Sequence, residues 1–253
     1  MKTLLLKELR WNWRSFRYPA FLLVVLFFAL LDPPMTKYTS EIITYFAEGL
    51  AIVMPDPTPE DAFVAYLSDV SQIGILVLIF VAMGSVSREK ETGVTGWILS
   101  KPVSRWQYLA AKVIVLYLTI ILGILGCSTL AYLYTTTLLG TFSLAGAAWA
   151  TMSLIAFVLL FGTVVFTFST ILKSPLQAGG LTLTIFFLMG ILNLFVAGTE
   201  AARLYPSTLI SQLRPLVEGT TALPEIAEPL AVSLGLCALL LFLAGRRFAR
   251  MEL

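Results

Sequence analysis

Histidine is absent from this 253-residue sequence, and cysteine occurs only twice. Without histidine, the HExxH metalloprotease motif, Ser-His and Cys-His nucleophilic catalysis and a histidine pH switch are excluded. Cys127 and Cys237 each lie deep in an apolar block, so we interpret them as packing residues and not as a disulfide framework. The seven methionines are scattered, so the sequence supports no metal path through the chain.

Charged residues are also scarce, at 13% of the chain, whereas 58% of residues are hydrophobic and the mean hydropathy is +0.89. A soluble domain carries about 25% charged residues. The formal net charge of +2 is too small to indicate a nucleic-acid partner. The apolar residues form long blocks, and about 20 apolar residues suit a bilayer core of roughly 30 Å. The sequence therefore predicts an all-α integral membrane protein that crosses the cell membrane several times.

We expect a single transmembrane domain with about six transmembrane helices. They are predicted at residues 19–31, 72–87, 108–134, 148–172, 177–197 and 229–245. Two polar segments, 32–71 and 198–228, lie between spans on the outer side. Within the first of them we expect a helical stretch over 40–54, which ends at a proline cluster because proline lacks an amide donor and clashes with the preceding turn.

Residues 1–18 precede the first span and are predicted to form an amphipathic helix in the membrane interface. One helical face is apolar (Leu5, Leu9, Trp13, Phe16), and another is a basic stripe (Lys7, Arg10, Arg14, Arg17). Tryptophan is favoured at headgroup depth and basic residues face the headgroups. A signal peptide is the competing interpretation, but the basic region is too long and no small-x-small cleavage site precedes Asp32. We therefore expect this segment to be uncleaved.

The positive charges predict an orientation for the chain. Fourteen of its seventeen basic residues fall on one side of the predicted spans, and only Lys37, Arg203 and Arg214 fall on the other. Because cytoplasmic loops carry an excess of lysine and arginine, both termini are predicted to be cytoplasmic. Lys112 would then snorkel back to the interface where its span begins. The acidic residues gather on the outer side, where they are a candidate docking surface for an extracellular partner.

The predicted spans lack the groups that several membrane functions need. An ion-coupled transporter normally has an ionisable group at membrane depth. No Asp or Glu lies in the apolar blocks from the third span onward, and Asp69 lies at the outer end of the second span. We expect Asn193, the one amide at depth in the fifth span, to hydrogen-bond between helices. A TVGYG channel filter and a GxxxxGK[ST] nucleotide loop are both missing, so energy for transport must come from another polypeptide.

The loop at residues 88–107 carries the functional signal. Charges of both signs over 88–93 are followed by an apolar stretch, 94–99, that is too short to cross a membrane. We predict a short amphipathic helix over 89–99 on the cytoplasmic face, whose Trp97 and Leu99 need a protein groove or the membrane interface. Pro102 then breaks the chain, and Ser104 is predicted to be the N-cap of the third span.

The stretch Arg88-Glu89-Lys90-Glu91-Thr92-Gly93, with Leu99-Ser100-Lys101-Pro102-Val103-Ser104-Arg105 and then Lys112, resembles the first cytoplasmic loop of ABC transporter permeases of the ABC-2 class. That loop reads approximately E-[RK]-E-x-G-T, a short helix and L-L-S-x-P-V-S-R. This sequence departs from it at Thr92 and Val94, on either side of Gly93. The N-terminal helix also resembles the elbow helix of the family. The resemblance covers the layout of the whole chain, but its sequence-specific part is confined to residues 88–112.

The resemblance implies a permease subunit, without enzymatic activity or cofactor of its own, in a transporter that most often exports. It implies a second permease copy, as a homodimer, and separate ABC ATP-binding subunits that hold ATP and Mg²⁺. Charged contacts to the ATPase would come from Glu89, Glu91 and Arg105. The implied ATPase-coupling residues are Glu89, Glu91, Thr92, Gly93, Trp97, Leu99, Pro102, Ser104 and Arg105, beside elbow-helix residues Lys7, Arg10, Trp13 and Arg14. Residues 198–228 would re-enter the outer leaflet.

Two other classes of function stay open on the residues alone. A membrane scaffold or sensor partner outside the ABC class would bind no ATPase and would tolerate loss of the 88–105 loop. An intramembrane enzyme would need Ser-Lys chemistry, for which we find no buried lysine. The few polar groups in the spans favour a lipid, a hydrophobic peptide or a drug over a sugar as substrate, and the sequence identifies none of them.

Overall fold

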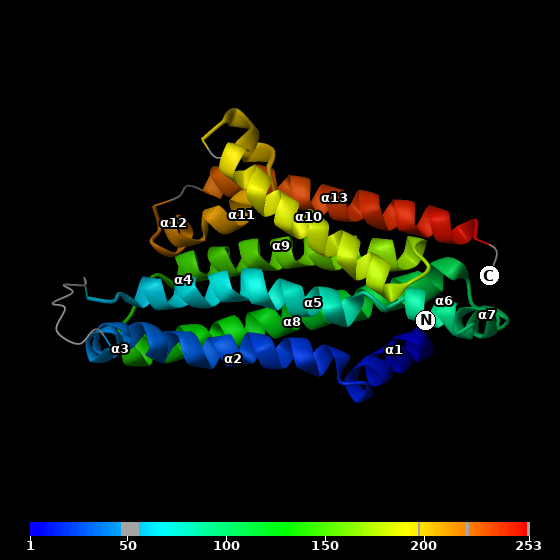
Figure 1. Cartoon of the computed structure of the whole chain (residues 1–253), viewed down its shortest axis with the longest axis horizontal. Helices are drawn as coiled ribbons and strands as arrows, with labels where there is room; N and C mark the ends of the chain where they lie inside the picture. Colours follow the sequence, from blue (N-terminus) through cyan, green and yellow to red (C-terminus); the bar gives the residue numbers. More distant parts are fainter. Residues whose placement is uncertain (47–55, 197, 221–222, 252–253) are drawn as a thin grey trace.

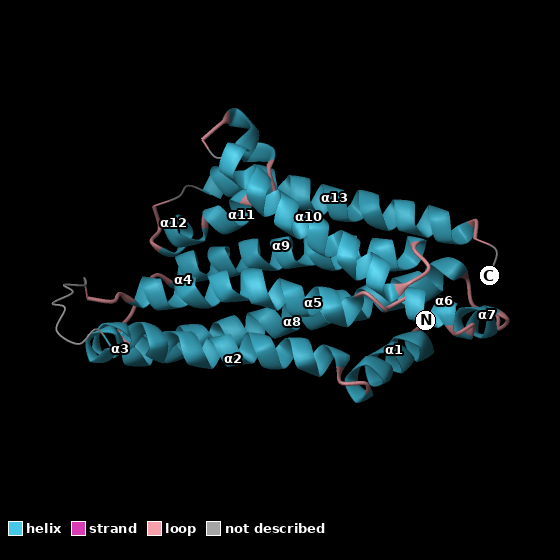
Figure 2. Ribbon diagram, in the orientation of Figure 1, coloured by secondary structure: helices cyan, strands magenta, loops and turns pink. Residues whose placement is uncertain are grey.

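The structure, a computed structural model, describes residues 1–46, 56–196, 198–220 and 223–251. Within these ranges every regular element is a helix, and six helices are long and apolar enough to cross a membrane. The long helices lie side by side along the longest dimension of the molecule (Figures 1 and 2). The predicted all-α class with six spans is confirmed.

The first two spans are longer than predicted. Helix α2 runs over Arg17–Lys37 and packs against α4 (Pro59–Asp69), which continues through a π-helical turn (Val70–Gly74) into α5 (Ile75–Ala82). The predicted break after residue 31 was wrong for the helix, because α2 continues through Asp32-Pro33-Pro34. Prolines within membrane helices are tolerated when neighbouring helices support the backbone.

The predicted start of the second span at residue 72 was also too late. Pro59 occupies the first turn of α4, where its missing amide costs no helical hydrogen bond. The side chain of Thr58 accepts a hydrogen bond from the Asp61 amide, and Asp61 accepts one in return from the Thr58 amide, which forms a capping box. A helix start is therefore encoded within the segment that we expected to lie outside the membrane.

Four further long helices complete the bundle: α8 (Arg105–Leu138), α9 (Leu144–Ile171), α10 (Pro175–Val196) and α13 (Leu223–Ala249). Ser104 caps α8 by accepting a hydrogen bond from the Gln107 amide, as predicted. Helix α9 is central. Of its most apolar stretch of 18 residues, 89% is buried inside the bundle, compared with 11% of the corresponding stretch of α10. In Figure 1, α10 slants across the outside of the bundle.

Helix α1 (Lys2–Arg14), the two short helices α6 (Ser87–Glu91) and α7 (Val94–Leu99), and the C-terminal end of α13 lie at the same end of the bundle (Figure 1). We call it the basic end, because fourteen of the seventeen lysines and arginines belong to the segments that lie there. The opposite, acidic end carries α3 (Thr39–Phe46); the rest of the helical stretch predicted over 40–54 lies outside the described residues. That the basic end faces the cytoplasm stays a prediction from charge.

The second polar segment folds back onto the bundle at the acidic end. A 3₁₀ turn (Glu200–Leu204) leads to α11 (Thr208–Ser211) and α12 (Leu213–Val217), both in contact with α9. A Cβ atom at Gly146 would lie 2.5 Å from the carbonyl oxygen of Leu216, so only glycine allows α12 to approach α9 this closely. Arg214 forms ion pairs with Asp61 and Glu218. Re-entry of this segment into the membrane stays a prediction.

Candidate functional site: the 88–107 segment and its anchors

The 88–107 segment contains two helices, and the prediction of a single helix over 89–99 was wrong. Helix α6 ends at Glu91, and α7 begins at Val94, because Gly93 adopts a left-handed conformation with φ of +73°. Glycine ends helices in this way because it has no Cβ penalty. In α7, Thr95 and Ile98 are buried, whereas the Trp97 side chain is 67% exposed. The interruption of the helix at Gly93 thus leaves Trp97 pointing outward at the basic end.

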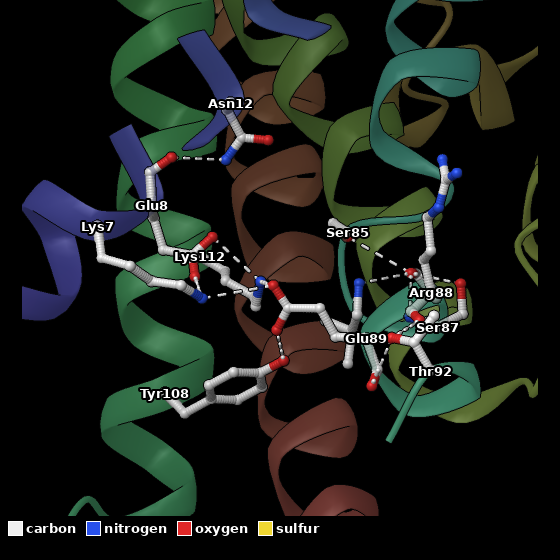
Figure 3. Close-up of polar contacts among 12 residues, drawn as sticks. Lys7, Glu8, Asn12, Ser85, Ser87, Arg88, Glu89, Thr92, Tyr108 and Lys112 are labelled. Carbon is white, nitrogen blue, oxygen red and sulfur yellow. Dashed lines mark hydrogen bonds and ion pairs between the residues drawn. The ribbon is translucent and has the colours of Figure 1, made fainter. Parts of the chain in front are cut away.

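A network of buried charges lies behind α6 (Figure 3). The Lys112 ammonium, on α8, donates hydrogen bonds to Oε1 of Glu89 at 2.9 Å and to Oε2 of Glu8 at 3.1 Å. The Tyr108 hydroxyl donates to the other oxygen of Glu89 at 2.6 Å. Lys7 donates to Glu8 at 2.8 Å. These contacts join the N-terminal helix, the 88–107 segment and the third span.

The network is electrically balanced, with two ammonium groups and two carboxylates. Its central members are shielded from solvent, since the side chains of Lys112, Glu8 and Glu89 are 5%, 3% and 14% exposed. Burial alone would lower the pKa of Lys7, but its hydrogen bond to Glu8 and the charges of Glu8 and Glu89 raise that pKa above its usual value. Removing one partner of a buried pair leaves an uncompensated charge, so loss of a single member of this network would be strongly destabilising.

Two of the three residues expected to make charged contacts with an ATPase contact this chain instead. Glu89 points into the buried network. Arg105 donates from Nη1 to the carbonyl oxygens of Phe248, Ala249 and Met251, at 3.0, 3.1 and 2.5 Å. Arg105 thereby binds carbonyls at the end of α13 and in the turn after it, of which the Phe248 carbonyl also accepts the Met251 amide. Glu91, the third of these residues, is exposed.

The remaining predicted coupling residues form the turns of the segment. The Thr92 hydroxyl donates to the Arg88 carbonyl at 2.9 Å and closes the end of α6. Leu99 is half-buried against the core, and the turn that contains Pro102 leads to the cap at Ser104. Leu99 therefore faces the protein and not the groove of a partner.

Two anchors that sequence reasoning missed tie α6 to the end of α9. Ser169 accepts hydrogen bonds from the amides of Val86 and Ser87 at 3.0 and 3.1 Å. The Lys90 ammonium donates to the carbonyl oxygens of Thr170 and Leu172 at 2.6 and 2.7 Å. A lone serine in an apolar helix carries no sequence signal of this role, because serine commonly bonds its own backbone.

The face of α1 that packs against the protein carries two buried polar residues beside Leu5. Glu8 and Asn12, one helical turn apart, are buried, and the Asn12 amide donates to the Glu8 carbonyl at 2.9 Å. Leu9, Trp11 and Trp13 are exposed, as are Arg10 and Arg14. A buried acid on a basic helix was the available signal for the network. The expectation that no lysine is buried was wrong, because Lys112 is 5% exposed and paired with Glu8 and Glu89. Snorkelling of Lys112 to the membrane interface stays a prediction.

At the acidic end a cavity of about 480 Å³ lies between the second, fourth and fifth spans and α11. Its lining includes phenylalanines 157, 186 and 187. Asn193 also lines it, and the Asn193 side-chain oxygen accepts a hydrogen bond from the Ser207 hydroxyl at 2.7 Å. We expected Asn193 to bond between helices, but its partner Ser207 lies in the turn that precedes α11. Among the described residues, no group of three or more Cys, Asp or Glu could hold a metal ion.

Residues 3–253 match the sequence model of a family described as ABC-2 family transporter protein. The chain belongs to the ABC-2 transporter family. It is also 30% identical over 137 residues to the uncharacterized transmembrane protein YxlG of Bacillus subtilis (strain 168), a match that covers 53% of each chain. The chain thus spans about half the length of this curated relative.

Membership of the ABC-2 family agrees with the resemblance in the 88–112 region and with the six apolar helices. Members of this family are membrane components without catalytic activity of their own, and they work with ATP-binding subunits. This ABC-2 protein is accordingly a multi-pass membrane protein of the transporter class.

Proposed function

We propose that this ABC-2 protein is the permease subunit of an ABC exporter, driven by separate ATP-binding subunits that dock on the 88–107 segment. The observation that carries the proposal is the exposed face of α7. Trp97 is 67% exposed and Val94 39% exposed, although α7 is anchored to the protein through Thr95 and Ile98 on its other side. Exposed tryptophan is enriched among residues that dominate protein–protein binding.

The chemistry of this tip suits a groove in a partner protein. The Lys101 ammonium lies 4.3 Å from the centre of the Trp97 ring, which positions the ring by a cation–π contact. Glu91, exposed at the end of α6, adds a negative charge to the same 88–107 segment. We place ATP and Mg²⁺ on the partner subunit.

The polar contacts of α6 connect the exposed face of α7 to the membrane-spanning helices. Movement of α7 by a closing ATPase pair would be passed to α8 through Glu89–Lys112, to α9 through Ser169 and Lys90, and to α1 through Glu8. Packed elements with fixed polar contacts shift as units instead of deforming locally. This arrangement supports ATP-driven rearrangement of the spans.

The test is copurification of this chain with its ATP-binding subunit from native membranes, followed by an ATPase assay. We expect the Glu91→Ala/Trp97→Ala double variant to lose the subunit by at least tenfold. The matched control is Glu225→Ala/Trp149→Ala, which removes an exposed glutamate and a 46% exposed tryptophan from segments at the acidic end. An ATPase retained equally by both double variants would contradict the docking surface. A complex that contains no ATPase would favour the scaffold or sensor function.

We further propose a homodimer in which α10 faces a second copy. Only 11% of the most apolar 18-residue stretch of α10 is buried within the chain. Its residues Phe187, Ile191 and Leu194 are more than half exposed. The test is oxidative cross-linking of Ile191→Cys in a background that lacks Cys127 and Cys237, with Leu239→Cys on α13 as the control. Cross-linking at Leu239→Cys but not at Ile191→Cys would place the second copy elsewhere.

A further inference from the structure

A pocket of about 520 Å³ opens at the basic end, between α1, the start of α2 and the turn from α5 into α6. It lies next to the buried network but contains two cations that the network does not use, Arg17 and Arg88. In Figure 3 the Arg88 side chain extends away from Glu89, and no dashed contact reaches its guanidinium. Trp11, Ser15 and Ser85 also line the pocket.

The charges that line this pocket do not balance. Four cations (Lys7, Arg17, Arg88, Lys112) face two carboxylates (Glu8, Glu89), which leaves an excess of two positive charges. Both carboxylates are already bonded to Lys112 and Lys7. Neither guanidinium is within ion-pair distance of a carboxylate in the described part of the chain, and the charges of Arg17 and Arg88 repel each other. An anion between them would relieve that repulsion.

The pocket holds Arg17 at a defined position, whereas the Arg88 side chain is exposed at its edge. Nη2 of Arg17 lies 3.7 Å from the Cβ position of Gly84, so the half-buried guanidinium rests against the backbone between α5 and α6. The Ser15 and Ser85 hydroxyls make only long hydrogen bonds, each 3.4 Å, to the Asn12 carbonyl and to Ser169. Bonds of this length are weak, so both hydroxyls can turn toward a bound anion.

We propose that this pocket binds the phosphate of an anionic phospholipid, between the guanidiniums of Arg17 and Arg88. The planar guanidinium matches phosphate oxygens with two parallel hydrogen bonds. Basic pockets between membrane helices on the cytoplasmic side are typical sites for anionic headgroups. A lipid is favoured over free phosphate because the pocket lies where an interfacial helix meets the first span, and Trp11 on its rim is 56% exposed. The site needs no ATPase and is independent of the proposed function.

The experiment uses the full chain, purified in detergent and stripped of lipid, and measures the thermal unfolding midpoint. Phosphatidylglycerol is titrated against phosphatidylcholine, which carries the same phosphate but no net charge. We expect phosphatidylglycerol alone to raise the midpoint. In the Arg17→Gln/Arg88→Gln variant, the half-saturating concentration rises at least tenfold. The control Arg10→Gln/Arg14→Gln removes two exposed charges of α1 that do not line the pocket, and it keeps the wild-type response.

Three outcomes would overturn the proposal: equal stabilisation by the two lipids, an equal loss in the control variant, or full protection by inorganic phosphate alone, which would assign the pocket to a free anion. If the Arg17→Gln/Arg88→Gln variant does not fold, the proposal is tested by native mass spectrometry of the wild-type chain in micelles that contain both lipids. Preferential retention of phosphatidylglycerol supports the site, and retention in proportion to the micelle composition refutes it.

Discussion

Lys112, on the third span, donates a hydrogen bond of 2.9 Å to Oε1 of Glu89, in the short helix that begins the 88–107 segment. Because the side chains are 5% and 14% exposed, this ion pair lies in a region of low dielectric constant. It is one of several polar connections between the proposed docking segment and the membrane-spanning helices, alongside Tyr108–Glu89 and Lys90–Thr170.

We predict that Lys112→Met destabilises the folded chain by about 3–5 kcal/mol, because it leaves the carboxylates of Glu8 and Glu89 buried beside Lys7 alone. The Glu89→Gln/Lys112→Met double variant is electrically balanced and should be more stable than Lys112→Met. The measurement is the thermal unfolding midpoint in a fixed detergent.

The control for this prediction is Arg203→Met, which removes an ion pair with Glu200 whose side chains are 67% and 85% exposed. Exposed pairs contribute about 0–1 kcal/mol, so the midpoint should hardly move. If Lys112→Met behaved like Arg203→Met, the network would have no structural role.

The bundle was predictable because a bilayer demands long apolar blocks, which stand out in any sequence. Helix ends were less predictable. Asp32-Pro33-Pro34 contains helix-breaking residues, yet α2 continues through it while packed against α4. A local signal such as the Ser104 cap was predictable because its partner, Gln107, is three residues away.

The buried network was not predictable because its members come from separate parts of the chain. Glu8 and Lys112 are 104 residues apart, and no periodicity links them. Their charges suggested exposed positions, since isolated lysine and glutamate are almost never fully buried. Burial of these two charges is tolerated only because they pair with each other. The pairing arises from the way the helices pack and not from the local sequence.

We predict that Ser169→Ala loosens the start of α6. The Val86 and Ser87 amides would lose the hydroxyl that accepts their hydrogen bonds at 3.0 and 3.1 Å. A buried donor without a partner costs about 1–3 kcal/mol. Hydrogen exchange of amides 86–92 should therefore accelerate, by roughly tenfold for each 1.4 kcal/mol. The control Thr129→Ala removes a hydroxyl that bonds only its own helix, to Leu125, and should leave those amides unchanged. Unchanged exchange in Ser169→Ala would show that α6 is held by other contacts.

We predict that Arg105→Met frees the last turn of α13. Its guanidinium bonds three carbonyl oxygens there, and the Phe248 ring stacks on Tyr108 at 5.6 Å beside them. Hydrogen bonds to charged groups contribute about 1.5–3 kcal/mol, so amide exchange over 245–251 should rise well above the wild-type rate. Arg250→Met, an exposed residue in the same turn, is the matched control. Similar exchange in both variants would mean that Tyr108 and Phe248 hold the turn without Arg105.

The two glycines of the 88–107 segment should respond in opposite ways to alanine. Nothing lies within 4 Å of a Cβ at either Gly93 or Gly96, so neither substitution causes a clash. Gly93 has a φ of +73°, where an L-residue costs about 1–2 kcal/mol, whereas Gly96 lies within α7, where alanine is better than glycine by about 0.5–1 kcal/mol.

Gly93→Ala should therefore lower the unfolding midpoint and weaken ATPase binding, because it favours a continuous helix that would turn Trp97 away from its present direction. Gly96→Ala should leave both unchanged or improved, although it lies next to Trp97. Measuring the two variants side by side separates backbone conformation from surface chemistry. Loss of the ATPase in Gly96→Ala alone would mean that the partner approaches the backbone of α7, and that the break at Gly93 does not set the direction of Trp97.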